Sequence, residues 1–127
     1  MHWFKLLFDR LFRKPQRRES IPYRTQFIEG ALPKWIDAKT IYVIQEDGYL
    51  EHVSLICPCG CGETLHMNLL EDERPYWNLI QHKNGTVSLR PSIWRKHGCC
   101  SHFWIMSGYI HWYEHGVPPK NFSVGSV

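Results

Sequence analysis

The sequence has no long apolar run: no stretch of about 18 or more apolar residues is present, so no membrane-spanning helix is predicted. It also lacks the features of a secretory signal peptide. The apolar segment at residues 2–8 is interrupted by Lys5, and it is followed by Arg13-Lys14-Pro15 where a signal peptide would have small residues. These absences predict a cytoplasmic protein.

A disulfide framework is missing as well. The chain has five cysteines, an odd number, of which three lie within five residues and two are adjacent. Secreted disulfide-rich domains have even numbers of cysteines spread along the chain. The clustered cysteines instead favour a reducing compartment and a bound metal ion.

The body of the chain lacks an excess of charge of either sign. The formal net charge is +3, but residues 1–20 hold six basic and two acidic residues. The remaining residues hold nine basic and ten acidic ones. A nucleic-acid-binding domain is expected to carry a basic surface, so no specific nucleic-acid partner is predicted.

The patterns that are present indicate one small, mainly β domain. Aromatic residues make up 14% of the chain and favour strands. Three turn signals, Asp47-Gly48, Asn84-Gly85 and Ser107-Gly108, each separate two segments with strand patterns. The predicted fold is a small antiparallel sheet sandwich or an open barrel, with strands at 40–45, 50–56, 64–69, 76–82, 86–90, 102–106 and 109–113. The basic stretch at residues 90–97 is predicted to be a loop.

The two ends are predicted to lie outside this β-rich domain, which spans residues 21–116. Residues 1–20 read as an amphipathic, basic helix (2–14) with a linker, and residues 117–127 as a loose tail. The helix is predicted to dock on the domain or on a second copy. The alternative is peripheral contact with a membrane surface through residues 2–14.

The strongest chemical signal is the run Cys57-Pro-Cys-Gly-Cys-Gly62, which is followed about forty residues later by Cys99-Cys-Ser-His102. Zinc prefers four thiolate or imidazole ligands in a tetrahedron. We expect a zinc site with ligands drawn from Cys57, Cys59, Cys61, Cys99 and His102. In the favoured set, two of the first three cysteines are completed by Cys99 and His102. Cys100 is predicted to point away, and an iron–sulfur cluster is the alternative cofactor.

Other residues near these motifs suggest weaker hypotheses. Glu63 would act as a general base if zinc kept an open position. Ser92 and Ser101 are candidate nucleophiles near His102, although a metal-bound histidine cannot also be a free base. His66 is a candidate proton carrier, with a surface histidine as the simpler interpretation.

The motifs together resemble those of a family of small bacterial and phage proteins that is classed as a domain of unknown function. The resemblance covers residues 27–113 and rests on residues 57–62, 87–93 and 98–105, with Gly108 and Trp112. It implies metal binding. Some members of that family are encoded beside bacterial ubiquitin-like conjugation genes, which implies a peptidase acting on a ubiquitin-like protein.

Two functions therefore follow from the sequence. The first is a protein-interaction module whose zinc site is mainly structural, with a protein partner contacted by its aromatic residues. The second is a metal-dependent or metal-stabilised hydrolase, a peptidase for ubiquitin-like proteins. The hydrolase requires an open coordination position or a nucleophile and a base within hydrogen-bond reach of each other, whereas the interaction module requires neither.

Overall fold

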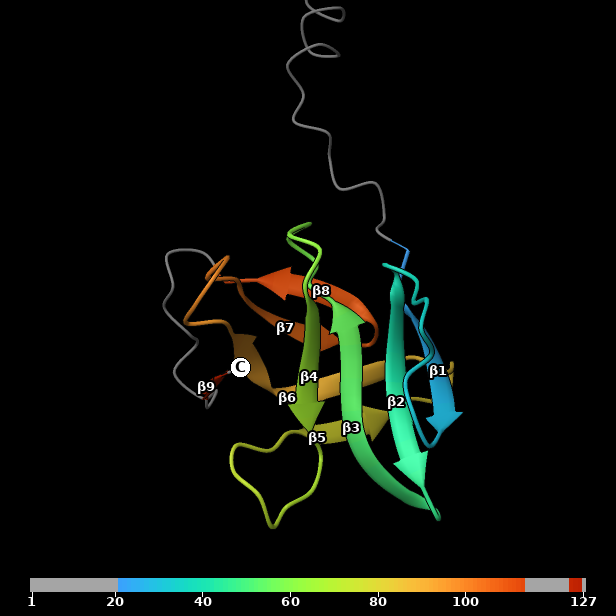
Figure 1. Cartoon of the computed structure of the whole chain (residues 1–127). Helices are drawn as coiled ribbons and strands as arrows, with labels where there is room; N and C mark the ends of the chain where they lie inside the picture. The colour runs from blue at the N-terminus through green and yellow to red at the C-terminus, as the bar shows by residue number, and fades with distance from the viewer. Residues whose placement is uncertain (1–20, 114–123, 127) are drawn as a thin grey trace, which may run out of the picture.

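The computed structural model describes residues 21–113 and the backbone of residues 124–126, and these residues form two small β-sheets (Figure 1). The first sheet has the strand order β1-β2-β3-β4. Its strands are β1 (Arg24–Glu29), β2 (Thr40–Glu46), β3 (Tyr49–Ile56) and β4 (Thr64–Asn68). The second sheet has the order β5-β6-β7-β8, and β9 pairs with β6. Its strands are β5 (Asn78–Gln81), β6 (Val87–Trp94), β7 (His102–Met106), β8 (Tyr109–Trp112) and β9 (Val124–Ser126).

One hydrophobic core joins the two sheets. Val43, Val53 and Leu55 of the first sheet and Phe103 and Ile105 of the second belong to a single buried cluster. Alternate residues of a strand point to opposite faces, so the inward face of each sheet supplies this cluster while the outer faces remain available for polar side chains. The core thus fixes β6 and β7, the strands that carry Ser92 and His102.

The prediction of a mainly β protein is confirmed, and the three predicted hairpins are present, with turns at Asp47-Gly48, at residues 83–85 and at Ser107-Gly108. The sheets do not close into a barrel. They are not wholly antiparallel, because β1 pairs with β2 and β9 with β6 in parallel. The predicted helix at 2–14 lies outside the described residues. Within the part of the chain that is described there are only strands and loops, and no helix there is long and apolar enough to cross a membrane.

The prediction of a loop at residues 90–97 is wrong for its first half. Strand β6 continues past Pro91 to Trp94, with a shift in register between Leu89 and Ile93. Proline lacks a backbone N–H and is tolerated at such irregular positions of a sheet. Beyond the shift, Ile93 pairs with Phe103 and Trp94 with His102. This irregular end of β6 carries Ser92 and places it beside β7.

Candidate metal centre and serine–histidine pair

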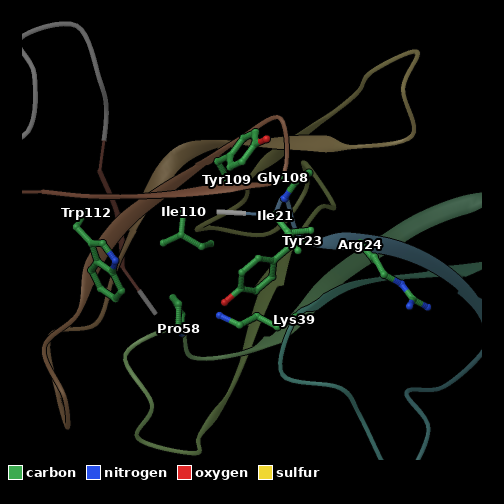
Figure 2. Close-up of a pocket in the computed structure, with 10 residues that line it drawn as sticks. Ile21, Tyr23, Arg24, Lys39, Pro58, Gly108, Tyr109, Ile110 and Trp112 are labelled. Carbon is green, nitrogen blue, oxygen red and sulfur yellow. The ribbon is translucent and has the colours of Figure 1, made fainter. Parts of the chain in front are cut away.

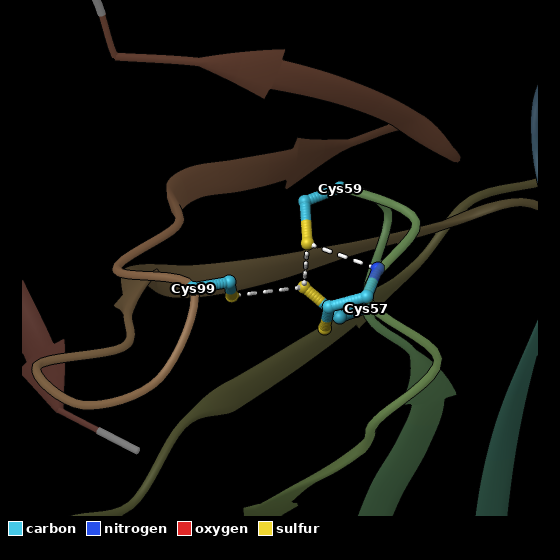
Figure 3. Close-up of side chains that lie close together, drawn as sticks. Cys57, Cys59 and Cys99 are labelled. Carbon is cyan, nitrogen blue, oxygen red and sulfur yellow. Dashed lines mark hydrogen bonds between the residues drawn. The ribbon is translucent and has the colours of Figure 1, made fainter.

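Four cysteine sulfurs converge at one end of the domain. The Sγ atoms of Cys57, Cys59, Cys61 and Cys99 all lie within 4.8 Å of one another. The Cys57 sulfur lies 3.3 Å from that of Cys59 and 3.7 Å from that of Cys99 (Figure 3). Zinc–sulfur bonds of about 2.3 Å in a tetrahedron hold sulfurs roughly 3.8 Å apart, so the four residues fit a four-thiolate metal site.

The first loop can supply three ligands because of its local backbone geometry. Gly60 and Gly62 have φ values of 91° and 84°, which are accessible to glycine and strained for other residues. The chain therefore reverses direction tightly between the cysteines. The N–H of Cys61 donates to the Cys59 sulfur at 3.3 Å, and the N–H of Cys57 donates to the Glu63 carbonyl at 2.8 Å, which closes the loop.

The second loop, which connects β6 to β7, provides Cys99 and the positively charged side chain of Arg95. The Arg95 guanidinium donates to the Cys99 sulfur at 3.3 Å and forms an ion pair with Glu63 at 2.9 Å. The Arg95 side chain thus bridges the two loops. A zinc ion with four thiolates carries a net charge of −2, and a neighbouring guanidinium offsets part of that charge.

The thiols of this group differ in their proton affinity. Burial raises the pKa of Cys57 to about 12, whereas a hydrogen bond from the Ser101 hydroxyl lowers the pKa of Cys99 to about 6. At neutral pH and without an ion, Cys57 therefore keeps its proton while Cys99 is a thiolate. A bound cation would remove the Cys57 proton, because thiolate is the metal-binding form.

His102 was expected near this cluster as a ligand, but the four converging side chains are all cysteines. His102 opens β7, and its Nε2 lies 3.0 Å from the Ser92 hydroxyl oxygen. The first loop already supplies three sulfurs, so Cys99 completes the set of four. The histidine is therefore available to Ser92 as a partner.

The Ser92–His102 pair lies in a dry, aromatic environment. The exposed fractions are 0% for Ser92 and 6% for His102. The imidazole stacks against Trp94 and Tyr113, with ring centroids at 5.2 and 4.0 Å. Burial lowers the pKa of His102, which keeps the ring neutral near pH 7. A neutral imidazole with Nε2 facing a hydroxyl can accept its proton, the relation that a general base needs.

The rings on either side hold the imidazole in place. Among the residues described, His102 Nδ1 has no hydrogen-bond partner, and neither has the buried hydroxyl of Tyr113. The Trp77 indole donates to the Ser92 carbonyl at 3.3 Å and fixes the strand from the other side. The position of the base is thus set by stacking and by β-sheet pairing.

Two further serine–histidine pairs occur among the residues that the structure describes. Ser54 lies 2.7 Å from Nδ1 of His66, directly across the β3–β4 ladder. Ser88 lies 2.7 Å from Nε2 of His82, and its hydroxyl also accepts the N–H of Ser107, which opens the β7–β8 turn. Ser88 therefore helps to hold the β7–β8 turn in place. Among the described residues, the ring contact recorded for these two histidines is that of His66 with His52, so neither pair lies between two aromatic rings in the way that His102 does.

The remaining candidates from the sequence have other partners than the Ser92–His102 pair. Glu63 is engaged with Arg95, and the Ser101 hydroxyl contacts the sulfurs of Cys57 and Cys99 instead of His102. Cys100 is exposed and lies outside the sulfur group, as its predicted orientation implied. The sequence suggested Ser92 as a nucleophile near His102, but this pairing was not favoured, because the spacing Cys99-x-x-His102 indicated a metal ligand and a metal-bound histidine cannot also be a free base.

A pocket of about 570 Å³ opens beside the first cysteine loop (Figure 2). Its lining includes Pro58, Tyr23 and Lys39 together with Ile110 and Trp112 of β8. Figure 2 shows the Tyr23 hydroxyl directed toward Pro58. The Trp112 ring packs against Phe103, the residue after His102, with centroids 5.5 Å apart. The pocket therefore borders the first cysteine loop and the β7–β8 hairpin, which begins with His102.

The fold and the site define a small β protein with a cysteine cluster suited to a metal ion and a buried Ser–His pair. The chain belongs to the family of bacterial ubiquitination-like system serine proteases (BubE), whose model matches residues 28–113, more than half of the chain. Comparison with curated proteins and with solved structures gives no match. The family assignment agrees with the resemblance to proteins encoded beside ubiquitin-like conjugation genes.

Proposed function

We propose that this chain is a serine peptidase that uses Ser92 as nucleophile and His102 as general base to release a ubiquitin-like protein from its conjugates. The observation that carries the proposal is the 3.0 Å approach of His102 Nε2 to the Ser92 hydroxyl oxygen. Membership in a family described as serine proteases of a ubiquitination-like system supports both the reaction and the substrate class.

In the proposed reaction the Ser92 oxygen attacks the carbonyl carbon at the end of the ubiquitin-like tail, and the hydroxyl proton passes to His102 Nε2. The imidazolium then protonates the leaving group as its bond to the carbonyl carbon breaks. Water, deprotonated by His102, hydrolyses the resulting ester on Ser92 and restores the hydroxyl. Burial of the imidazole favours its neutral form at the start of this cycle.

We further propose that the four cysteines hold a structural zinc ion. The four sulfurs would fill all four positions of a tetrahedral ion, which would leave no place for a reactive water. The ion would link the loop after β3, in the first sheet, to the loop before β7, in the second. Cys99 lies three residues from His102, so the ion would hold the start of β7 in position. This role retains the structural zinc site expected from the sequence.

The proposal is tested by hydrolysis of a ubiquitin-like protein from a bacterial ubiquitination-like system that carries a fluorogenic coumarin amide at its C-terminus. Ser92→Ala and His102→Gln are expected to lower kcat/KM by roughly 10³-fold or more, since both remove groups that act in the transition state. Ser54→Ala and Ser88→Ala are the matched controls from the other two pairs, and Ser54→Ala is expected to leave the rate within about threefold of the parent.

Each variant should also retain the metal content and the circular dichroism spectrum of the parent chain. If Ser54→Ala lost hydrolysis while Ser92→Ala retained it, the reaction would belong to the Ser54–His66 pair, and the proposal would be overturned. Unchanged hydrolysis in both Ser92→Ala and His102→Gln would exclude this mechanism altogether.

A further inference from the structure

The end of β6 that carries Ser92 pairs with a strand from the far end of the chain. β5 pairs with β6 only as far as Arg90, where Asn78 lies opposite. Beyond this point β9 pairs with β6 in parallel, and because Ile93 lies opposite both Gly125 of β9 and Phe103 of β7, β9 occupies the edge of β6 away from β7. Within the described residues, β9 is the strand that covers this edge of β6.

The backbone groups that this edge presents can be assigned from strand alternation. The N–H of Arg95 donates to the Ser101 carbonyl on the β7 side. Successive residues of a strand direct their N–H and C=O groups to opposite sides, so Ile93 also faces β7. Ser92 and Trp94 face the β9 side. In agreement with this, the Ser92 carbonyl accepts the Trp77 indole N–H, and Trp77 directly precedes β5 on that side.

Without β9, the edge at residues 92–94 would therefore offer free backbone donors and acceptors beside the nucleophile. Such an edge is a template for an extended peptide, which recognises it through main-chain hydrogen bonds. A peptidase needs its substrate extended and held next to the nucleophile. Ser92 is 0% exposed in the present arrangement, so a substrate cannot reach it until something moves.

We propose that the edge of β6 at Ser92–Trp94 is the binding site for the extended tail of the substrate, and that β9 occupies this edge in the free chain and is displaced by substrate. The inference rests on the proposed peptidase function. It adds that the edge of β6 recognises the substrate and that β9 competes with the substrate for this edge. The ligand class is an extended peptide segment that pairs through its backbone, as β9 does. The chain thus limits its own activity through residues 124–126.

The test compares Gly125→Pro with Gly125→Ala in the full-length chain. Gly125 lies between the positions of Ser92 and Trp94, so proline removes the amide best placed for pairing, whereas alanine keeps it. With the coumarin-tagged ubiquitin-like protein as probe, Gly125→Pro is expected to lower KM roughly three- to tenfold, the effect of losing one or two backbone hydrogen bonds from the competitor. Gly125→Ala should match the parent, and kcat should change little in either variant.

A second measurement uses hydrogen exchange in the Ser92→Ala chain, which is proposed to bind substrate without cleaving it. The amide of Trp94 should exchange faster in Ser92→Ala/Gly125→Pro than in Ser92→Ala, and an excess of the ubiquitin-like protein should restore its protection. Equal KM values for Gly125→Pro and Gly125→Ala, with active enzyme and unchanged exchange at Trp94, would overturn this inference while leaving the peptidase function intact. Absence of cleavage in every chain, including the parent, would instead count against the peptidase function.

Discussion

Replacement of Cys99 by serine tests the metal centre, because the adjacent Cys100 provides a matched control. Cys99 belongs to the group of four sulfurs, whereas the Cys100 sulfur lies outside it, 3.7 Å from the Gly98 carbonyl oxygen. Both cysteines are exposed and both substitutions exchange sulfur for oxygen. Any difference between Cys99→Ser and Cys100→Ser therefore reports on the metal ligand.

The expected size of the effect follows from the four-sulfur geometry. Structural zinc contributes about 10–16 kcal/mol in small domains, of the order of the entire stability of a domain, about 5–15 kcal/mol. If the four thiolates share this energy equally, loss of Cys99 removes about 3 kcal/mol. That corresponds to roughly 100-fold weaker binding and, for a domain of this size, a fall in Tm of more than about 10 °C.

Metal content by mass spectrometry and thermal unfolding by circular dichroism would measure both quantities. Cys99→Ser should bind the ion roughly 100-fold more weakly, so that it loses the ion at a lower chelator concentration, and should melt early, whereas Cys100→Ser should resemble the parent. A chelator should lower the Tm of the parent and of Cys100→Ser. Equal retention of metal against a chelator and equal Tm in the two variants would refute the reasoning, since Cys99 would then hold no ion.

The pH dependence of metal binding adds a second check on the same site. Without the ion the pKa of Cys57 is about 12 and that of Cys99 about 6. Binding must therefore release the Cys57 proton at neutral pH, so affinity should rise with pH across that range. Below about pH 6, protonation of Cys99 should weaken binding further. A metal affinity that is constant from pH 6 to 8 would contradict the four-thiolate site.

Three further outcomes are expected. Burial lowers the pKa of His102 below its ordinary value of 6.5, so the midpoint of the fall in kcat/KM toward acid should lie below pH 6.5. Stability should also fall as the pH drops below 6.5, because the unfolded chain takes up this proton first; a midpoint above pH 6.5 in the pH–rate profile would contradict this. Arg95→Gln should weaken metal binding about tenfold in a competitive chelator titration, because the guanidinium contacts the Cys99 sulfur and Glu63; unchanged affinity would contradict a role for its charge. Phe103→Ala should cost about 3–5 kcal/mol in urea unfolding, since the ring is fully buried in the shared core; a cost below 1 kcal/mol would place Phe103 outside the core.

The sequence predicted the hairpins and the clustering of cysteines because both depend on local chemistry. Asp47-Gly48 and Ser107-Gly108 place positive φ values where the turns need them. The short spacing of the first three cysteines forces their side chains into one loop. These features depend on neighbouring residues and can be recognised without knowing the rest of the fold.

Pairings over longer distances could not be predicted in the same way. Pro91 and the basic residues after it suggested a loop, yet β7 and β9 hold Ser92–Trp94 in a strand. The spacing Cys99-x-x-His102 suggested two ligands, but β7 begins at His102 and turns its imidazole toward Ser92. Both outcomes depend on strands that are distant in the sequence but adjacent in the sheet. A single sequence contains little information about which distant strands pair.

The site of covalent modification by a small fluorophosphonate decides most directly whether Ser92 is the nucleophile. Peptide mapping by mass spectrometry of the treated full-length chain should find one adduct, on Ser92, and His102→Gln should abolish it while Ser54→Ala and Ser88→Ala retain it. An adduct on Ser54, Ser88 or Ser101 with Ser92 unmodified, or labelling of Ser92 that is unaffected by loss of His102, would contradict the proposed Ser92–His102 peptidase.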